Sequence, residues 1–250
     1  MAQKRDNCII ILVDPPEPEK LSPELKAAFG PERAAHVNSD LVTGAYKLAK
    51  AFPDAILLLS YEKTPHHPDL TWLDQEDPGF LEVKALPRET RLREAFRLAF
   101  FTGAKKAIYL NHLSPEIKKD WLYQAFDSAN EKTVALGPNQ DGSFYLLGLT
   151  QANLKLLETP GFLQGKNCES MAERAKKTKL AVFNTPETYS INGEEDVLRW
   201  MESLAPSSNP FKTEERPAQE TQAAREHKRS TRHHHKETPV PPPAPEKPPL

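Results

Sequence analysis

Two short runs of continuous apolar residues constrain the fold of this 250-residue chain. Cys8–Val13 forms the first run, and Ala55–Ser60 repeats its character. A strand that is apolar at every position fits a parallel sheet that helices cover on both faces. Helical patterns follow at residues 32–52 and 89–101, and a further short strand is expected at residues 106–110. This alternation predicts an α/β fold in three layers, with a mostly parallel, Rossmann-like sheet flanked by helices.

The composition changes sharply near residue 205. Beyond it the chain has almost no apolar residues and is rich in proline and charged side chains, so it can bury too little surface to offset the entropy lost on ordering. We therefore predict a folded domain over residues 1–204 and a disordered, proline-rich, charged tail over residues 205–250. Pro241–Pro243 would suit recognition by a protein partner as a polyproline II segment, or the tail is a plain solubilising extension.

Charge and cysteine usage narrow the functional classes. The chain has 33 basic and 35 acidic residues and a formal charge of −2, and its folded part has no basic stripe with interleaved aromatic residues. A nucleic-acid partner is therefore not expected. Cys8 and Cys168, the two cysteines, have no metal-ligand spacing, which favours a reducing cytoplasm. The first apolar run is too short to cross a membrane or to act as a signal segment, so no membrane contact is expected.

Gly137–Gly148 joins a polar, glycine-marked turn directly to an apolar strand. Pro138 and Gly142 bend the chain and place Asp141 at the crest of the turn. A carboxylate there can face a ligand hydroxyl or a metal; alternatively, it caps its own turn by accepting a hydrogen bond from a nearby backbone N–H.

Ligands of open α/β sheets collect at the carboxyl ends of the strands. This rule selects three loops, at residues 14–23, 111–114 and 137–143. In the second loop, Ser114 and Pro115 are expected to cap and open a helix that extends to about Ser128.

From residue 8 to about residue 200, the chain resembles bacterial glycosyltransferases of type A fold, the nucleotide-diphospho-sugar transferases, in particular the arsenosugar-biosynthesis type. The family motif Gly-Pro-x-x-Asp-Gly-Gly-Tyr-Tyr-Leu-x-Gly corresponds to residues 137–148, with Ser143 and Phe144 replacing the second Gly and first Tyr. The resemblance implies a nucleotide or nucleotide sugar as partner and Asp141 as the catalytic candidate. The ligand-binding residues that it implies are Arg91, Asn111, Gly137, Pro138, Gly142 and Ser143. For Arg91 the alternative is an arginine on a solvent-exposed helix face.

The same comparison reveals losses of charged residues. The family's first loop reads Pro-x-Pro-Gly-x-x-Lys-Thr-Arg-Leu; here Ser22, Pro23 and Glu24 stand for Lys, Thr and Arg. The aspartate that the family is expected to use for its divalent cation is Leu113, which cannot ligate Mg²⁺ or Mn²⁺. Rescue by Asn111 or His112 is conceivable. A later family segment, Asp-x-Asp-Thr-x-x-Asp-Leu, corresponds to Ser190–Val197 and keeps only Asp196.

These departures leave two hypotheses, and neither includes a metal cofactor. In the first, the protein is a divergent, non-catalytic or weakened family member that acts by binding a ligand or partner. In the second, it is an active glycosyl- or nucleotidyltransferase whose relocated, metal-independent site uses Arg91, Asp141 and residues such as Lys20.

Overall fold

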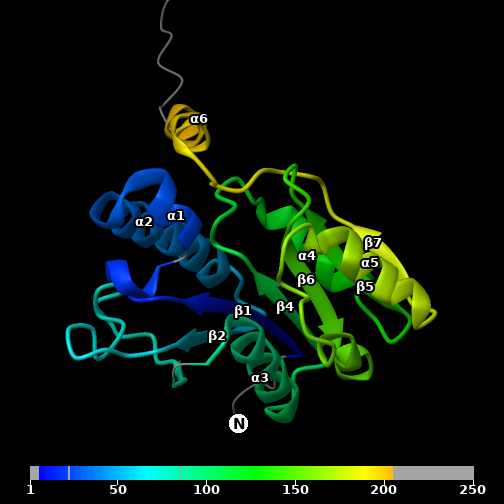
Figure 1. Cartoon of the computed structure of the whole chain (residues 1–250). Helices are drawn as coiled ribbons and strands as arrows, with labels where there is room; N and C mark the ends of the chain where they lie inside the picture. The colour runs from blue at the N-terminus through cyan, green and yellow to red at the C-terminus, as the bar shows by residue number, and fades with distance from the viewer. Residues whose placement is uncertain (1–5, 22, 85, 205–250) are drawn as a thin grey trace, which may run out of the picture. The chain divides into compact units, whose positions relative to one another are not determined.

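A seven-stranded sheet forms the centre of the protein (Figure 1). The structure, a computed structural model, describes residues 6–21, 23–84 and 86–204, so the predicted tail at 205–250 lies outside the described residues. The strand order is β3-β2-β1-β4-β6-β5-β7. The strands are β1 (Asn7–Val13), β2 (Ala55–Tyr61), β3 (Leu81–Glu82), β4 (Lys106–Leu110), β5 (Thr133–Pro138), β6 (Phe144–Thr150) and β7 (Ala181–Asn184).

All neighbouring strands are parallel except at β6, which is antiparallel to both β4 and β5. The reversal follows from the short turn at residues 139–143, because a connection of this length can join only antiparallel strands. The sequence predicted the apolar strand that follows this turn. Its direction relative to β4 is a property of the assembled sheet.

Helices cover both faces of the sheet and complete the three layers. They are α1 (Pro23–Phe29), α2 (Pro31–Lys50), α3 (Arg88–Phe101), α4 (Lys119–Ser128), α5 (Asn167–Lys177) and α6 (Glu194–Leu204), with 3-10 helices η1 (Pro18–Lys20) and η2 (Gln151–Leu157). One hydrophobic cluster joins α3, α5 and η2 to the sheet, and a second joins α2 and α4 to the opposite face. The α/β fold class is confirmed.

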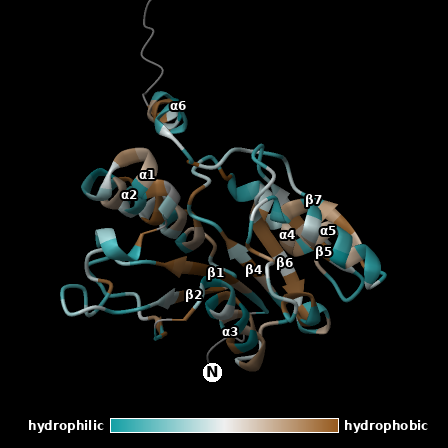
Figure 2. Cartoon of the chain, viewed as in Figure 1, coloured by the Kyte–Doolittle hydropathy of each residue, from teal (hydrophilic) through white to brown (hydrophobic). Residues whose placement is uncertain are grey.

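The first strand shows why the sheet needs cover on both sides. Its residues 8–13 are at most 1% exposed, with Ile10 and Leu12 in one cluster and Ile9 and Ile11 in the other. Each fully buried aliphatic side chain of this kind stabilises the fold by roughly 1.5–3 kcal/mol. Figure 2 shows the result, with hydrophobic strands such as β1 and β6 between helices that carry both hydrophobic and hydrophilic residues.

Three local predictions needed correction. Helix α1 forms in a stretch for which no helix was predicted, and Gly30, with φ of 74°, separates it from α2. Weakly alternating apolar residues at 80–86 indicate a strand of that length, but the strand that forms is only Leu81–Glu82. The helix expected to open at Ser114 begins instead at Lys119, because the Ser114 hydroxyl donates to Asn139 Oδ1 at 3.1 Å rather than capping a helix.

Helices that could cross a membrane are lacking among the described residues, since each is too short or too polar.

Candidate functional site

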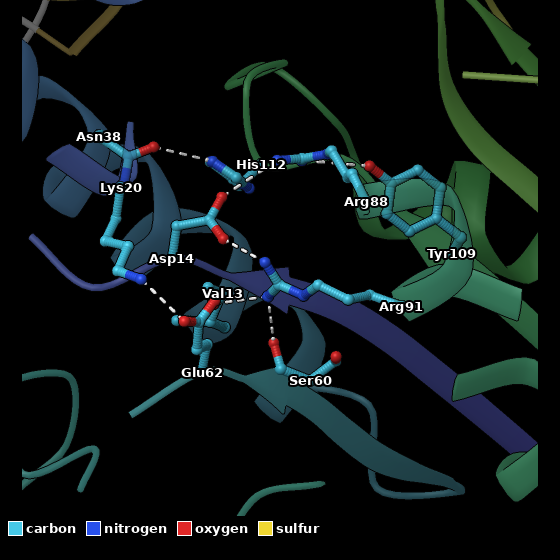
Figure 3. A network of polar contacts seen from close by, with 10 residues as sticks. All are labelled: Val13, Asp14, Lys20, Asn38, Ser60, Glu62, Arg88, Arg91, Tyr109 and His112. Atoms are coloured by element: carbon cyan, nitrogen blue, oxygen red, sulfur yellow. Dashed lines mark hydrogen bonds and ion pairs between the residues drawn. The ribbon is translucent and has the colours of Figure 1, made fainter. Parts of the chain in front are cut away.

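A buried group of polar and charged side chains lies where β1, β2 and β4 end (Figure 3). Asp14 directly follows β1, and Arg88 and Arg91 come from the first turn of α3. The two carboxylate oxygens of Asp14 accept separately from Arg88 Nη1, at 3.1 Å, and from Arg91 Nη1. We call this group the Asp14 cluster; its members are Asp14, Asn38, Ser60, Arg88, Arg91, Tyr109 and His112.

Arg91 holds three elements together. Its Nη2 donates to Val13 O and to Ser60 O, both at 2.9 Å, so the guanidinium ties α3 to the ends of β1 and β2. The side chain is 7% exposed, which rules out the alternative of an arginine on a solvent-exposed helix face. Arg91 thus has a clear structural role, and its contact with a ligand stays a prediction.

His112 is buried and neutral within the Asp14 cluster. Its Nε2 lies 3.0 Å from Asn38 Oδ1, and the residue is 2% exposed. Burial, with the nearby charge of Arg88, lowers the pKa of His112 to about 3. Burial works to raise the pKa of Asp14, but the charges of Arg88 and Arg91 outweigh it and hold that pKa below its usual range. The cluster therefore contains two cations and one anion, a net charge of +1.

Unpaired polar atoms are concentrated in the same place. Four buried side-chain atoms without a hydrogen-bond partner belong to the Asp14 cluster, and the remaining one among the described residues is Thr150 Oγ1. The four atoms are Asn38 Nδ2, Ser60 Oγ, Arg91 Nε and His112 Nδ1. Because buried polar atoms in native proteins are nearly always paired, these four atoms make the Asp14 cluster a candidate ligand site.

Asp141 is tied to its surroundings through both carboxylate oxygens. Oδ1 accepts from Ser143 N at 2.8 Å and Ser143 Oγ at 2.6 Å, the turn-capping contact. Oδ2 accepts from Ser190 Oγ at 2.5 Å and Asn192 Nδ2 at 2.8 Å. Partial burial works to raise the pKa of Asp141, but these hydrogen bonds prevail and lower it. The carboxylate therefore links its turn to the segment before α6.

The other predicted ligand residues have backbone or packing roles. A Cβ on Gly137 would lie 2.5 Å from Tyr145 Cζ, so only glycine leaves room for that ring. Gly142 has φ of 84°, which favours glycine, and a Cβ there would approach Lys166 Cγ to 2.9 Å.

Pro138 and Asn111 also take part in hydrogen bonds with other parts of the protein. Pro138 O, at the irregular end of β5, accepts from Thr188 N at 3.2 Å. Asn111 Oδ1 accepts from Leu113 N at 3.3 Å within its own turn. Binding of a ligand by any of these residues stays a prediction.

The residues at the expected cation position do not fit a divalent metal. Leu113 packs against a third hydrophobic cluster, formed by Leu21, Leu25, α2 and residues 189–197. Ser190 and Asn192, which stand for the two leading carboxylates of the later segment, are neutral donors to Asp141. Over the described part of the chain, His, Cys, Asp and Glu side chains form no group of three arranged to hold a metal ion.

Comparisons with known proteins agree with this architecture. A family described as "Uncharacterized protein conserved in bacteria (DUF2064)" matches residues 49–160. No curated protein matches the sequence. A proposed nucleotide-diphospho-sugar transferase from Desulfovibrio desulfuricans G20 superposes with a TM-score of 0.69, at 20% identity over 81% of this chain and 89% of that one.

Two further solved structures share the fold at lower identity. A nucleotidyl transferase from Methanothermobacter thermautotrophicus has a TM-score of 0.56 and 12% identity over 79% of this chain and 97% of that one. A 4-diphosphocytidyl-2C-methyl-D-erythritol synthase from Anaerococcus prevotii DSM 20548 has a TM-score of 0.53 and 10% identity over 81% and 98%. The chain has the nucleotide-diphospho-sugar transferase fold. The predicted resemblance is thus confirmed for the fold.

Within this transferase fold, the predicted site residues fall into two groups. Arg91 belongs to the Asp14 cluster, whereas Asp141 and Ser143 belong to the turn beside α6, and no hydrogen bond or ion pair between described residues joins Arg91 to Asp141.

Sequence reasoning missed Asp14 and Arg88. Two signals were available: Asp14 is the first polar residue after the first strand, and Arg88 precedes Arg91 by three residues, which places both on one helix face.

Proposed function

We propose that this protein is a divergent, non-catalytic or weakened member of the nucleotide-diphospho-sugar transferase fold that acts by binding, with a nucleotide or nucleotide sugar as ligand. The position of Leu113 carries the proposal. Where the resemblance expects a carboxylate for the divalent cation, this chain has an apolar side chain that packs into a hydrophobic cluster.

The chemistry of transfer explains why this position matters. When a nucleotide sugar reacts, negative charge develops on the departing diphosphate, and a metal ion with basic side chains normally stabilises it. Here both oxygens of Asp141 are already occupied by neutral donors, and Pro23 and Glu24 replace a threonine and an arginine in the first loop. The carboxylate for a metal ion and the first-loop arginine, which would each stabilise the charge on the diphosphate, are thus both missing, while the fold is retained.

A second candidate, a metal-independent transferase, is favoured by the charge of the Asp14 cluster. Its net charge of +1 lies at the carboxyl ends of the strands, and the Arg88 side chain is 34% exposed, so a ligand phosphate can approach it. Two arginines can stabilise a developing phosphate charge without a metal, although Asp14 offsets half of their charge.

Calorimetry and a turnover assay together test these alternatives. Nucleoside diphosphates and nucleotide sugars of the common bases are titrated into the protein with and without Mn²⁺, and release of nucleoside diphosphate is followed over hours. We expect binding that Mn²⁺ does not strengthen, and no release. Release without metal that Arg88→Gln abolishes supports the second candidate, whereas metal-dependent release at an ordinary enzymatic rate, or no binding across the panel, refutes the proposal.

The matched control for Arg88→Gln is Lys105→Gln. Lys105 is an exposed cation in an ion pair with Asp6. It precedes the first residue of β4, so it lies at the opposite end of the strands from the Asp14 cluster. Its replacement should leave ligand binding unchanged. Equal weakening by both variants would indicate nonspecific attraction between the protein and anionic ligands.

A further inference from the structure

Phe101, the last residue of α3, is exposed in an unusual way. Its side chain is 89% exposed, more than any other large hydrophobic residue among those described. Arg88 opens the same helix, and a 14-residue helix is about 20 Å long, so Phe101 lies well away from the Asp14 cluster. Figure 1 places this end of α3 near the start of β1, at the amino edge of the parallel strands. An exposed phenylalanine beside further apolar surface is typical of an interaction surface.

Two adjoining cavities lie at this end of α3, and Phe101 lines the first of them. This first cavity has a volume of about 520 Å³, and its lining combines apolar side chains such as Leu81, Leu98 and Leu154 with the charged pair Glu94 and Arg97. The other, of about 460 Å³, includes Thr150 in its lining, and Phe100 and Gln151 belong to both. The Thr150 hydroxyl is buried and has no hydrogen-bond partner among the described residues. The surface thus combines a protruding aromatic residue, an apolar groove and an unpaired polar atom.

The charges around this surface are balanced. Three cations, Arg97, Lys105 and Lys106, and three acids, Asp6, Glu94 and Glu131, lie in or beside the cavities. A two-fold contact brings the same surface of two molecules together, so it needs charges that are complementary to themselves. This surface meets that condition, because Glu94 pairs with Arg97 and Asp6 with Lys105 within one chain, and two copies that meet there can exchange these ion pairs without leaving a charge unpartnered.

Helix α6 offers an instructive contrast. It also exposes apolar side chains, including Met201 at 58%, but it carries four acidic residues and one basic residue. The charged residues are Glu194, Glu195, Asp196, Glu202 and Arg199. Two copies of that face would repel each other, so exposure alone does not make a surface suited to self-association.

We propose that two copies of this protein associate through the surface at the amino-terminal ends of the parallel strands, with Phe101 of each copy covering the groove of the other. Aromatic residues that enter a partner's pocket commonly dominate such interfaces. The proposal goes beyond the ligand-binding function and is independent of it, because the Asp14 cluster takes no part in the contact.

Sedimentation equilibrium on the full chain tests the proposal. The monomer mass is 28.1 kDa, and we expect the mass of the wild type to rise toward twice that value as its concentration is raised to about 200 µM. Phe101→Glu should weaken the dimer at least ~100-fold, and Met201→Glu should leave it unchanged. Thermal unfolding of each variant checks the fold; Phe101→Ser serves as a second variant if the charged one does not fold. A monomeric wild type, a dimer that survives loss of Phe101, or equal weakening by Met201→Glu overturns the proposal.

Discussion

Mild acidification should destabilise this protein through His112. The histidine is buried, bonded to Asn38 and next to Arg88, and its pKa in the folded protein is about 3, against roughly 6.5 in the unfolded chain. Between these pH values the unfolded state binds a proton that the folded state does not, so stability falls as pH falls. The full effect is about 5 kcal/mol, of which roughly 2–3 kcal/mol should be lost between pH 7.5 and 4.5.

Urea unfolding at a series of pH values, followed by tryptophan fluorescence, measures this loss. The control is His112→Gln, which does not titrate and can still reach Asn38 with its amide. The difference between wild type and variant should change by about 2–3 kcal/mol across the range, because titration of the other groups is common to both proteins. If the free energies of unfolding of the two proteins change in parallel with pH, His112 is not held neutral by its surroundings. The net charge of +1 assigned to the Asp14 cluster would then be wrong.

Three substitutions test the remaining contacts. Asp14→Asn should lower the free energy of unfolding by about 3 kcal/mol at pH 7, since it leaves Arg91 buried without its anion. Because the pKa of Asp14 is lowered in the folded protein, this loss should shrink only below about pH 4. A loss under about 1 kcal/mol contradicts the pairing. Gly137→Ala should lower the free energy of unfolding by about 1–3 kcal/mol, because the added Cβ overlaps the Tyr145 ring. The loss should be smaller when Tyr145→Leu is also present, and additive losses in chemical denaturation would exclude the overlap. Asp141→Ala should lower stability by about 1–2 kcal/mol in thermal unfolding, whereas an unchanged melting temperature would mean that its turn does not depend on the carboxylate.

The strands and their environment could be predicted because the information is local. In Cys8–Val13 and Ala55–Ser60, uninterrupted apolar residues already indicate burial on both faces, and the structure places them side by side as β1 and β2. Ser114 shows the limit, since it has the residue type of a helix cap but its hydroxyl bonds to Asn139, 25 residues away.

The sequence by itself determined the three-layer α/β class, the polar turn around Asp141 and the absence of a carboxylate at position 113, since each depends on residue type and short-range order. Only the tertiary structure decided that Asp14 binds Arg88 and Arg91, that Asp141 bonds to Ser190 and Asn192, and that Leu113 lies in an apolar cluster. The physical reason is distance along the chain. These contacts join residues about 50 or more positions apart, and whether a charged group meets a ligand, a counter-ion or a neutral donor depends on which distant segments the folded sheet brings to the same edge.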